Sequence, residues 1–173
     1  TIHVMQSDAT TLPADSAGKQ AVRLLLSGPA GGVIAATAIA KSSGHEKLLT
    51  LDMGGTSTDV SLINHQPSYT NEGQVAEFPL AIPMLDIHTI GAGGGSIARI
   101  DSAGGLHVGP ESAGAQPGPA CYGDGGTQAT ITDANVVLGR LPVAQTWASG
   151  LTLDRAAAQQ ALQPIADKMQ CTI

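Results

Sequence analysis

The sequence predicts a mixed α/β fold, in which short strands form a sheet and a few helices pack against it. Two observations support this prediction. Short apolar runs bounded by turn residues, such as residues 48–51 and 60–63, are typical of buried strands. Segments with apolar side chains at helical spacing, such as residues 33–40 and 151–169, predict helices. The length of 173 residues fits one domain with its own core.

The first part of the chain is predicted to contain two strands joined by a loop. Residues 2–5 form a short apolar run, and residues 6–16 are mostly polar. The apolar run at 21–26 predicts a second, buried strand with the Arg23 head group directed toward solvent.

A helix over residues 33–40 is predicted to follow that strand. Ser27 is the expected N-cap, and Pro29 lies in the first turn, where its missing N–H has no cost. The glycines at this junction would leave amides free to hold an anion. The alternative is that a helix of small residues packs closely against the sheet.

The stretch from Leu48 to Ile63 organises the rest of the prediction, because it is interpreted as a strand, a tight turn and a second strand. The turn combines flexible backbone with hydroxyl groups, in Gly54, Gly55, Thr56, Ser57 and Thr58. Unpaired N–H groups in such a concavity suit a phosphate. Asp52 and Asp59 bracket the turn, and carboxylates beside phosphates indicate a hydrated Mg²⁺. The alternative is an ordinary hairpin whose hydroxyls cap their own backbone.

Residues 68–78 predict a third strand beside this hairpin, and residues 83–90 lead into a glycine-rich segment at 91–96. Asp86 and His88 are two residues apart, so in a strand they face the same side, either as a metal or acid–base pair or in a structural role. Glycines at this density exclude a helix and favour a loop close to a ligand or another backbone. The Rossmann and P-loop fingerprints are both absent from the sequence.

The rest of the chain, from residue 97 onward, is predicted to contain a hairpin, a surface loop and two helices. The hairpin covers residues 97–108, and the loop 109–126 includes Cys121, which has no identifiable base beside it in the sequence. A helix is expected from Thr132, as N-cap, to Gly139. Pro164 is expected to kink or divide the helix at 151–169.

Composition excludes several classes of protein. The net charge of −6 and an aromatic content of 2% argue against nucleic-acid binding, because basic and stacking surfaces are lacking. Two cysteines do not form a disulfide framework, which favours a reducing, cytoplasmic location. The longest apolar stretch, around residues 30–40, is too short and too rich in glycine to span a membrane.

Six motifs, taken in order, resemble those of one family. They are Ser-Gly-Pro-Ala-Gly-Gly-Val at 27–33, Asp-Met-Gly-Gly-Thr-Ser-Thr-Asp-Val at 52–60, Thr-Ile-Gly-Ala-Gly-Gly-Gly-Ser at 89–96, Val-Gly-Pro-Glu-Ser-Ala-Gly-Ala at 108–115, Pro-Gly-Pro-Ala-Cys-Tyr-Gly at 117–123 and Thr-Asp-Ala-Asn at 132–135. This set resembles the A-type subunits of the hydantoinase/oxoprolinase family, which include N-methylhydantoinases, 5-oxoprolinases and ketone carboxylase subunits. The resemblance covers about residues 20–145. The segment at Asp8-Ala9-Thr10 departs from it, where the family runs into glycines.

The resemblance implies an actin-like ATPase fold, in which two ribonuclease-H-like lobes close on a nucleotide. It implies ATP and Mg²⁺ as cofactors, with Asp52 catalytic and Asp52 and Asp59 as metal ligands. The implied nucleotide-binding residues are Gly54, Gly55, Thr56, Ser57, Thr58, Gly91, Gly93, Gly94, Gly95 and Ser96. The implied reaction is hydrolysis of a cyclic amide, such as a hydantoin or 5-oxoproline, after phosphoryl transfer from ATP.

Each lobe of that fold has one Asp-x-Gly-Gly-Thr hairpin, and this chain has one in total. The resemblance therefore implies that residues 1–173 form a single lobe of a longer subunit, inactive alone. The expected partners are the N-terminal lobe of the same subunit and a B-type subunit or domain. Two alternatives stay open: an ATP-dependent ketone carboxylase subunit, and a non-catalytic, nucleotide-gated module with the same fold.

Overall fold

The structure is a computed structural model that describes residues 2–75, 78–147 and 150–173. The chain divides into two compact units. Unit 1 comprises Thr1–Asp52 and Asp59–Ile90, and unit 2 comprises Met53–Thr58 and Gly91–Ile173. Helices and strands occur in both, which confirms the predicted mixed α/β class.

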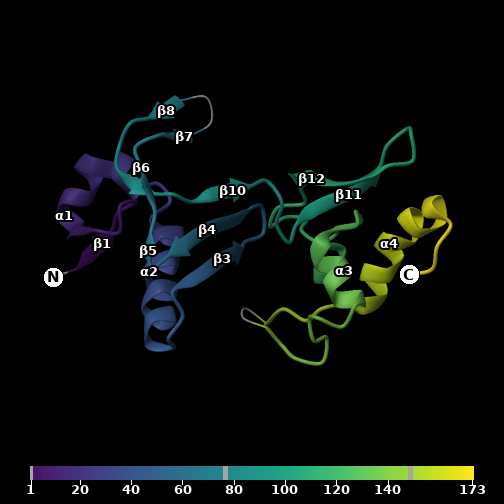
Figure 1. The fold of residues 1–173 in the computed structure, drawn as a ribbon. Coiled ribbons are helices and arrows are strands. Elements are labelled where there is room, and N and C mark those ends of the chain that lie inside the picture. Colours follow the sequence, from purple (N-terminus) through teal and green to yellow (C-terminus); the bar gives the residue numbers. More distant parts are fainter. Residues whose placement is uncertain (1, 76–77, 148–149) are drawn as a thin grey trace. The chain divides into compact units, whose positions relative to one another are not determined.

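The N-terminal elements of unit 1 are a small antiparallel strand pair followed by helical segments (Figure 1). In chain order they are β1 (His3–Met5), β2 (Thr11–Pro13), α1 (Ala14–Ala17), the 3₁₀ helix η1 (Gly18–Leu24) and α2 (Ser27–Ser42). The strand predicted at 2–5 is confirmed. The loop predicted at 6–16 is wrong in part, because β2 and the start of α1 fall inside it.

The sheet of unit 1 has the strand order β10–β4–β3, with β5 paired to β4. Two further antiparallel pairs, β6–β9 and β7–β8, lie in the same unit. The bounds are β3 Lys47–Met53, β4 Thr58–Asn64, β5 Gln66–Pro67, β6 Tyr69–Thr70, β7 Gly73–Val75, β8 Phe78–Leu80, β9 Met84–Leu85 and β10 His88–Ile90. The core of this unit joins α2 to β4 and β9 through Ala30, Val33, Ile63 and Leu85.

Two sequence predictions for unit 1 strands are corrected by this topology. The run at 21–26 is not a strand, because residues 18–24 form η1, in which no residue is buried. An apolar run this short fits helix and strand equally by periodicity. The predicted strand at 68–78 is instead three short strands, none of which pairs with β4; residues 76–77 lie outside the described residues.

The start of α2 also differs from the prediction. Ser27 is the first helical residue rather than the N-cap; Leu26, in a left-handed conformation, holds that position without a side-chain cap. The first turns of the helix therefore include Gly28, Gly31 and Gly32. The element directly before the helix in the chain is η1, not a strand. The predicted strand–turn–helix anion site is absent from this described segment.

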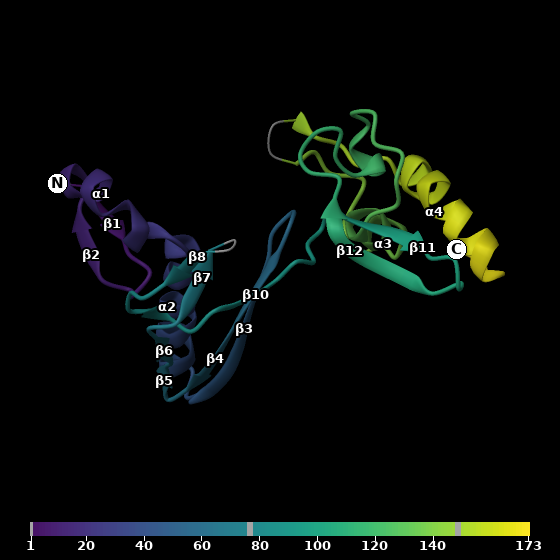
Figure 2. The ribbon, with the colours of Figure 1, turned by 90° about the horizontal axis from the view of Figure 1, so that it is seen from above.

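Unit 2 combines a β-hairpin with two helices. The antiparallel strands β11 (Ser96–Ile100) and β12 (Leu106–Ser112) confirm the predicted hairpin. The Asp101 carboxylate accepts hydrogen bonds from the amides of Ala103 and Gly105, at 2.9 and 2.8 Å, and these bonds shape its turn. The 3₁₀ helix η2 (Ala120–Tyr122) and the helices α3 (Ile131–Val137) and α4 (Arg155–Met169) complete the unit; Figure 2 shows α3 beside α4. Cys121, Val136, Leu153 and Ala158 form its core.

The N-terminus of α3 is held by a buried carboxylate. Thr130, not Thr132, is the N-cap, and it forms a capping box with Asp133. Asp133 is fully buried and also accepts hydrogen bonds from the amides of Ala120 and Cys121, at 3.3 and 2.8 Å. The left-handed Gly139 follows the helix, as predicted.

Helix α4 begins later than predicted and is not divided. Asp154 is its N-cap, and the helix continues through Pro164 to Met169. Among the described residues no single helix is long and apolar enough to cross a membrane, although one pair bent by 92°, Ala14–Leu24 with Ser27–Ser42, meets the length and composition criteria together.

Replacing Asp154 by alanine is expected to destabilise unit 2. The carboxylate accepts hydrogen bonds from the amides of Ala156 and Ala157, at 2.8 and 3.1 Å, and alanine leaves both without a partner. The expected loss in the free energy of unfolding is about 1 kcal/mol, measured by denaturant titration. Asp154→Ser, which keeps a capping oxygen, should lose less; an equal loss in both variants would contradict the capping role.

Candidate functional site

The two glycine-rich segments that the sequence singled out lie against each other in unit 2. The Gly94 amide donates a hydrogen bond to the Gly54 carbonyl oxygen at 2.9 Å, and the Gly95 amide donates to the Gly55 carbonyl oxygen at 2.7 Å. A further bond, from the Gly54 amide to the Ser57 carbonyl oxygen at 2.9 Å, closes the turn itself. Segments 54–58 and 91–96 thus form one local structure.

The glycines of the second segment are required for this contact. A Cβ atom on Gly93 would lie 2.7 Å from each of three backbone atoms, the Gly54 oxygen, the Gly55 carbonyl carbon and the Ser57 nitrogen. A Cβ atom on Gly95 would lie 3.0 Å from the Gly55 oxygen. Side chains here would separate the two backbones, which explains the density of glycine.

Buried hydroxyl groups hold the loop at 91–96 in place. The Ser96 hydroxyl accepts a hydrogen bond from the Gly93 amide at 2.9 Å, and the Thr58 hydroxyl donates to the Ala92 carbonyl oxygen. The amide and hydroxyl of Thr132 both donate to the Gly94 carbonyl oxygen, each at 2.8 Å. Thr58 and Ser96 are therefore engaged with backbone, and direct contact of either residue with a ligand stays a prediction.

The turn at 54–57 keeps its own donors available. Gly54, Gly55 and Thr56 are exposed, so the bend is not enclosed in the core. Within the described part of the chain, the amides of Gly55, Thr56 and Ser57 have no hydrogen-bond acceptor. Consecutive free amides beside hydroxyl groups form a concavity that suits a phosphate.

The two candidate metal ligands belong to unit 1, where they line one cavity. Asp52, at the end of β3, and Asp59, in β4, face a cavity of about 290 Å³ together with Pro29 and Gly32 of α2. The Asp59 carboxylate accepts a hydrogen bond from the Thr89 hydroxyl at 2.6 Å. Among the described residues there is no cluster of three His, Cys, Asp or Glu side chains. Mg²⁺ is typically held by one or two carboxylates together with phosphate oxygens, and this pair fits that pattern.

Sequence reasoning missed the contribution of α2 to this cavity. The motif at 27–33 was expected to form a turn, but it forms the first two turns of a helix whose Pro29 and Gly32 form part of the cavity wall. The sequence signal for this contribution is the run of small residues in the motif at 27–33. Thr89 was missed as a partner of Asp59, because nothing in the sequence indicates the pairing of β10 with β4.

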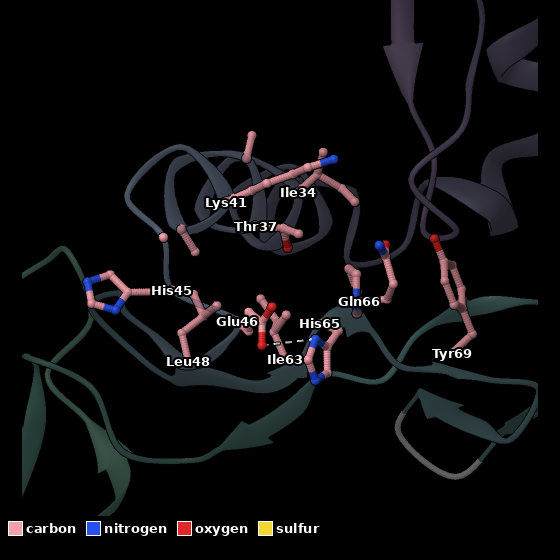
Figure 3. Close-up of a pocket in the computed structure, with 14 residues that line it drawn as sticks. Ile34, Thr37, Lys41, His45, Glu46, Leu48, Ile63, His65, Gln66 and Tyr69 are labelled. Atoms are coloured by element: carbon pink, nitrogen blue, oxygen red, sulfur yellow. Dashed lines mark ion pairs between the residues drawn. The ribbon is translucent and has the colours of Figure 1, made fainter.

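A second hollow in unit 1 contains none of the predicted site residues. Its volume is about 540 Å³, and its walls come from the C-terminal half of α2 and from the β3–β6 region (Figure 3). The ion pair drawn in Figure 3 joins His65 Nδ1 to Glu46 Oε2 at 3.4 Å, and both side chains are well exposed. Exposed pairs contribute little to stability.

The two cysteines should differ strongly in reactivity. Burial and the neighbouring Asp133 carboxylate raise the pKa of the Cys121 thiol to about 12, whereas Cys171 is exposed. Because only the thiolate reacts, iodoacetamide at pH 8 is expected to label Cys171 and leave Cys121 unmodified. Peptide mass spectrometry measures both sites; rapid labelling of Cys121 in the folded protein would contradict its burial.

Comparison with family models gives a match that spans the whole chain. The model described as hydantoinase/oxoprolinase matches residues 1–173. Caprolactamase subunit alpha of Pseudomonas jessenii is 40% identical over 159 residues, which are 91% of this chain and 23% of that protein. The 5-oxoprolinase of Pestalotiopsis fici is 53% identical over 120 residues, which are 69% of this chain and 9% of that protein.

Solved structures give the same result. The nucleotide-free structure of acetone carboxylase, an enzyme described as carrying out ATP-dependent acetone carboxylation, superposes on this chain with a TM-score of 0.84 at 31% sequence identity. The match covers 99% of this chain and 24% of that one. The crystal structure of the ATP-dependent caprolactamase superposes with a TM-score of 0.77 at 40% identity, over 88% and 22% of the two chains. This chain thus spans about a quarter or less of the proteins that it resembles.

Proposed function

This chain belongs to the hydantoinase/oxoprolinase family, and we propose that it is the nucleotide-binding part of an enzyme that hydrolyses a cyclic amide with ATP. The observation that carries the proposal is the open glycine turn of unit 2, whose free amides at Gly55, Thr56 and Ser57 are braced by the segment 93–95. Two of the similar proteins, a caprolactamase and a 5-oxoprolinase, are named for cyclic amides, and the former is described as ATP-dependent.

In this proposal the turn binds the phosphates of ATP. The amides of Gly55, Thr56 and Ser57 would donate hydrogen bonds to phosphate oxygens, and the hydroxyls of Thr56 and Ser57 would add two more donors. Gly93 and Gly95 allow the second backbone to approach the turn, and the Gly94 amide binds it. Gly91 belongs to the same loop, which Thr58 and Ser96 keep in position. These donors are fixed before the ligand arrives, so they lose little entropy on binding.

Asp52 and Asp59 are the residues that would hold Mg²⁺. When bound, the ion would neutralise phosphate charge as the terminal phosphoryl group of ATP leaves ADP. That group would pass to the amide oxygen of the substrate, and water would then attack the activated carbon, with release of phosphate and opening of the ring. Asp52 would also orient the attacking oxygen through a hydrogen bond to a water molecule.

The proposal places this chain in a longer, cytoplasmic subunit. Residues 1–173 would supply one nucleotide-binding lobe, an N-terminal lobe of the same subunit would complete the cleft, and a B-type subunit or domain would contribute to ring opening. The small share of each relative that the chain covers supports such additional parts.

A second candidate is an ATP-dependent ketone carboxylase subunit, which the TM-score of 0.84 with acetone carboxylase favours. A turnover assay on the full-length subunit with its B-type partner separates the candidates. We expect ATP hydrolysis coupled to consumption of hydantoin, 5-oxoproline or a lactam. Coupling to a ketone with bicarbonate instead would select the carboxylase, and ATP hydrolysis coupled to none of these substrates would select a non-catalytic, nucleotide-gated module.

A further inference from the structure

A pocket in unit 1 contains the Asp86 and His88 pair, which the sequence singled out and the proposed function does not use. Its volume is about 590 Å³, and its lining comes from residues 25–26, from the β6–β8 region and from residues 84–89. Small-molecule sites measure roughly 300–1,000 Å³ and combine an apolar lining with a few polar groups. We call this pocket the β10 pocket, after the strand that begins at His88.

The apolar part of the β10 pocket suits a hydrocarbon ring. Met84 and Leu85 are buried in the protein, and Leu25, Leu26 and Leu80 add three more aliphatic side chains to the lining. Covering apolar ligand surface with such side chains is favourable, because that surface is removed from water.

The polar part of the β10 pocket has side chains available for a ligand. The Asp86 amide donates a hydrogen bond to the Ser68 carbonyl oxygen at 2.9 Å, and its carbonyl oxygen accepts one from the Ser61 hydroxyl at 2.9 Å. Asp86 therefore offers its carboxylate to the pocket. Within the described part of the chain, neither this carboxylate nor the His88 imidazole has a hydrogen-bond or ionic partner.

The charges of the β10 pocket discriminate between ligands. Glu72 and Asp86 both contribute acidic side chains, and none of the described lining residues is Lys or Arg. An anionic ligand would be repelled by the two carboxylates and would find no cation to pair with. A neutral ligand with an N–H group fits better, because a carboxylate accepts hydrogen bonds.

The β10 pocket adjoins the cavity that contains the candidate metal ligands. Ile87 lines both cavities, and Thr89, which lines the β10 pocket, donates its hydroxyl hydrogen bond to Asp59 at 2.6 Å. A ligand in the β10 pocket would therefore lie beside the residues that are proposed to hold Mg²⁺.

We propose that the β10 pocket binds the cyclic amide and selects a neutral ring over one that carries a carboxylate, such as 5-oxoproline. This assignment rests on the proposed function and narrows its substrate class. The Asp86 carboxylate would accept a hydrogen bond from the amide N–H, and a ring N–H of His88 would donate one to the amide oxygen. The aliphatic side chains would cover the methylene groups of the ring.

Calorimetric titration of the full-length subunit in the absence of ATP tests this proposal with three compounds. We expect ε-caprolactam to bind at least about tenfold more tightly than 5-oxoproline, which is negatively charged. It should also bind about tenfold more tightly than cycloheptanone, which has the same ring size but no N–H. Binding of either compound as tightly as ε-caprolactam would overturn the proposal. Binding of ε-caprolactam without any ATP-coupled hydrolysis would instead count against the proposed function and leave the binding assignment standing.

A variant that fills the pocket tests its location. Leu80→Trp places a larger side chain in the lining and should weaken ε-caprolactam binding at least about tenfold, with ATP binding unchanged. The control Ile39→Trp changes an exposed residue of α2 outside the β10 pocket and should leave both affinities unchanged. Unchanged ε-caprolactam affinity in Leu80→Trp would place the lactam elsewhere.

A variant that removes one charge tests the selectivity without adding bulk. Asp86→Asn keeps an oxygen acceptor for the amide N–H, so ε-caprolactam affinity should change less than about threefold, whereas 5-oxoproline affinity should rise about tenfold. The control Asp124→Asn removes the charge of an exposed aspartate outside the pocket and should alter neither affinity. The selection by charge would be wrong if 5-oxoproline bound no better to Asp86→Asn than to the wild type.

Discussion

Replacing Gly93 by alanine is expected to lower ATP turnover by the full-length enzyme by about a hundredfold. The added Cβ atom would lie 2.7 Å from three backbone atoms of the turn at 54–57, and backbone cannot move aside as a flexible side chain can. The two segments would separate, and the hydrogen bonds from Gly94 and Gly95 that brace the turn would be lost. Steady-state kinetics should show the loss, together with a fall of about 2 kcal/mol in the free energy of unfolding.

The matched control is Gly18→Ala, a glycine-to-alanine change at a position where the added Cβ atom would have no heavy atom within 4 Å. Gly18 lies in η1, and the structure places it outside the proposed binding residues. This variant should keep wild-type turnover. Normal ATP turnover by Gly93→Ala would show that the contact between the two glycine segments does not matter for nucleotide binding.

Asp52→Asn is expected to reduce turnover by about a hundredfold or more while leaving stability almost unchanged. The side chain is exposed at the end of β3 and has no hydrogen-bond partner among the described residues, so its loss disturbs no packing. Asparagine keeps the shape of the side chain and removes the charge that would hold Mg²⁺. The Mg²⁺ concentration that gives half-maximal activity should therefore rise, which a purely structural role would not cause.

Asp124→Asn serves as the charge-matched control, because Asp124 is an exposed aspartate outside both the glycine turn and the cavity lined by Asp52 and Asp59. It should retain both wild-type turnover and the wild-type Mg²⁺ dependence. If Asp52→Asn behaved like Asp124→Asn, the assignment of Asp52 as a metal ligand and catalytic residue would be wrong.

Local chemistry was sufficient to predict the central turn. Gly54 and Gly55 between two apolar runs predicted a hairpin, and the structure has β3 and β4 on either side of an exposed bend. The glycines at 91–96 predicted a loop close to a ligand or another backbone, and the observed neighbour is the backbone of the first turn. These predictions succeeded because glycine is required where two backbones approach within hydrogen-bond distance.

Predictions that depended on distant partners failed. The run at 21–26 has strand-like composition, but residues 18–24 form η1 instead. One local pattern was also overlooked: Thr130, not Thr132, is the N-cap, because Thr130 forms a capping box with Asp133 three residues later. The pairing of β10 with β4 brings Thr89 to Asp59. No local sequence pattern predicts that these two strands are neighbours.

The carbonyl oxygen of Gly94 connects the glycine loop at 91–96 to the first turn of α3 in unit 2. It accepts two hydrogen bonds from Thr132, which is 38 positions further along the chain and immediately precedes the carboxylate that caps α3. Fraying of the first turn of α3 would therefore loosen the glycine loop directly. The shape of the proposed phosphate site is thus set in part from outside it. If the proposed function is correct, substitutions near η2 and α3 will change nucleotide affinity without contacting the nucleotide.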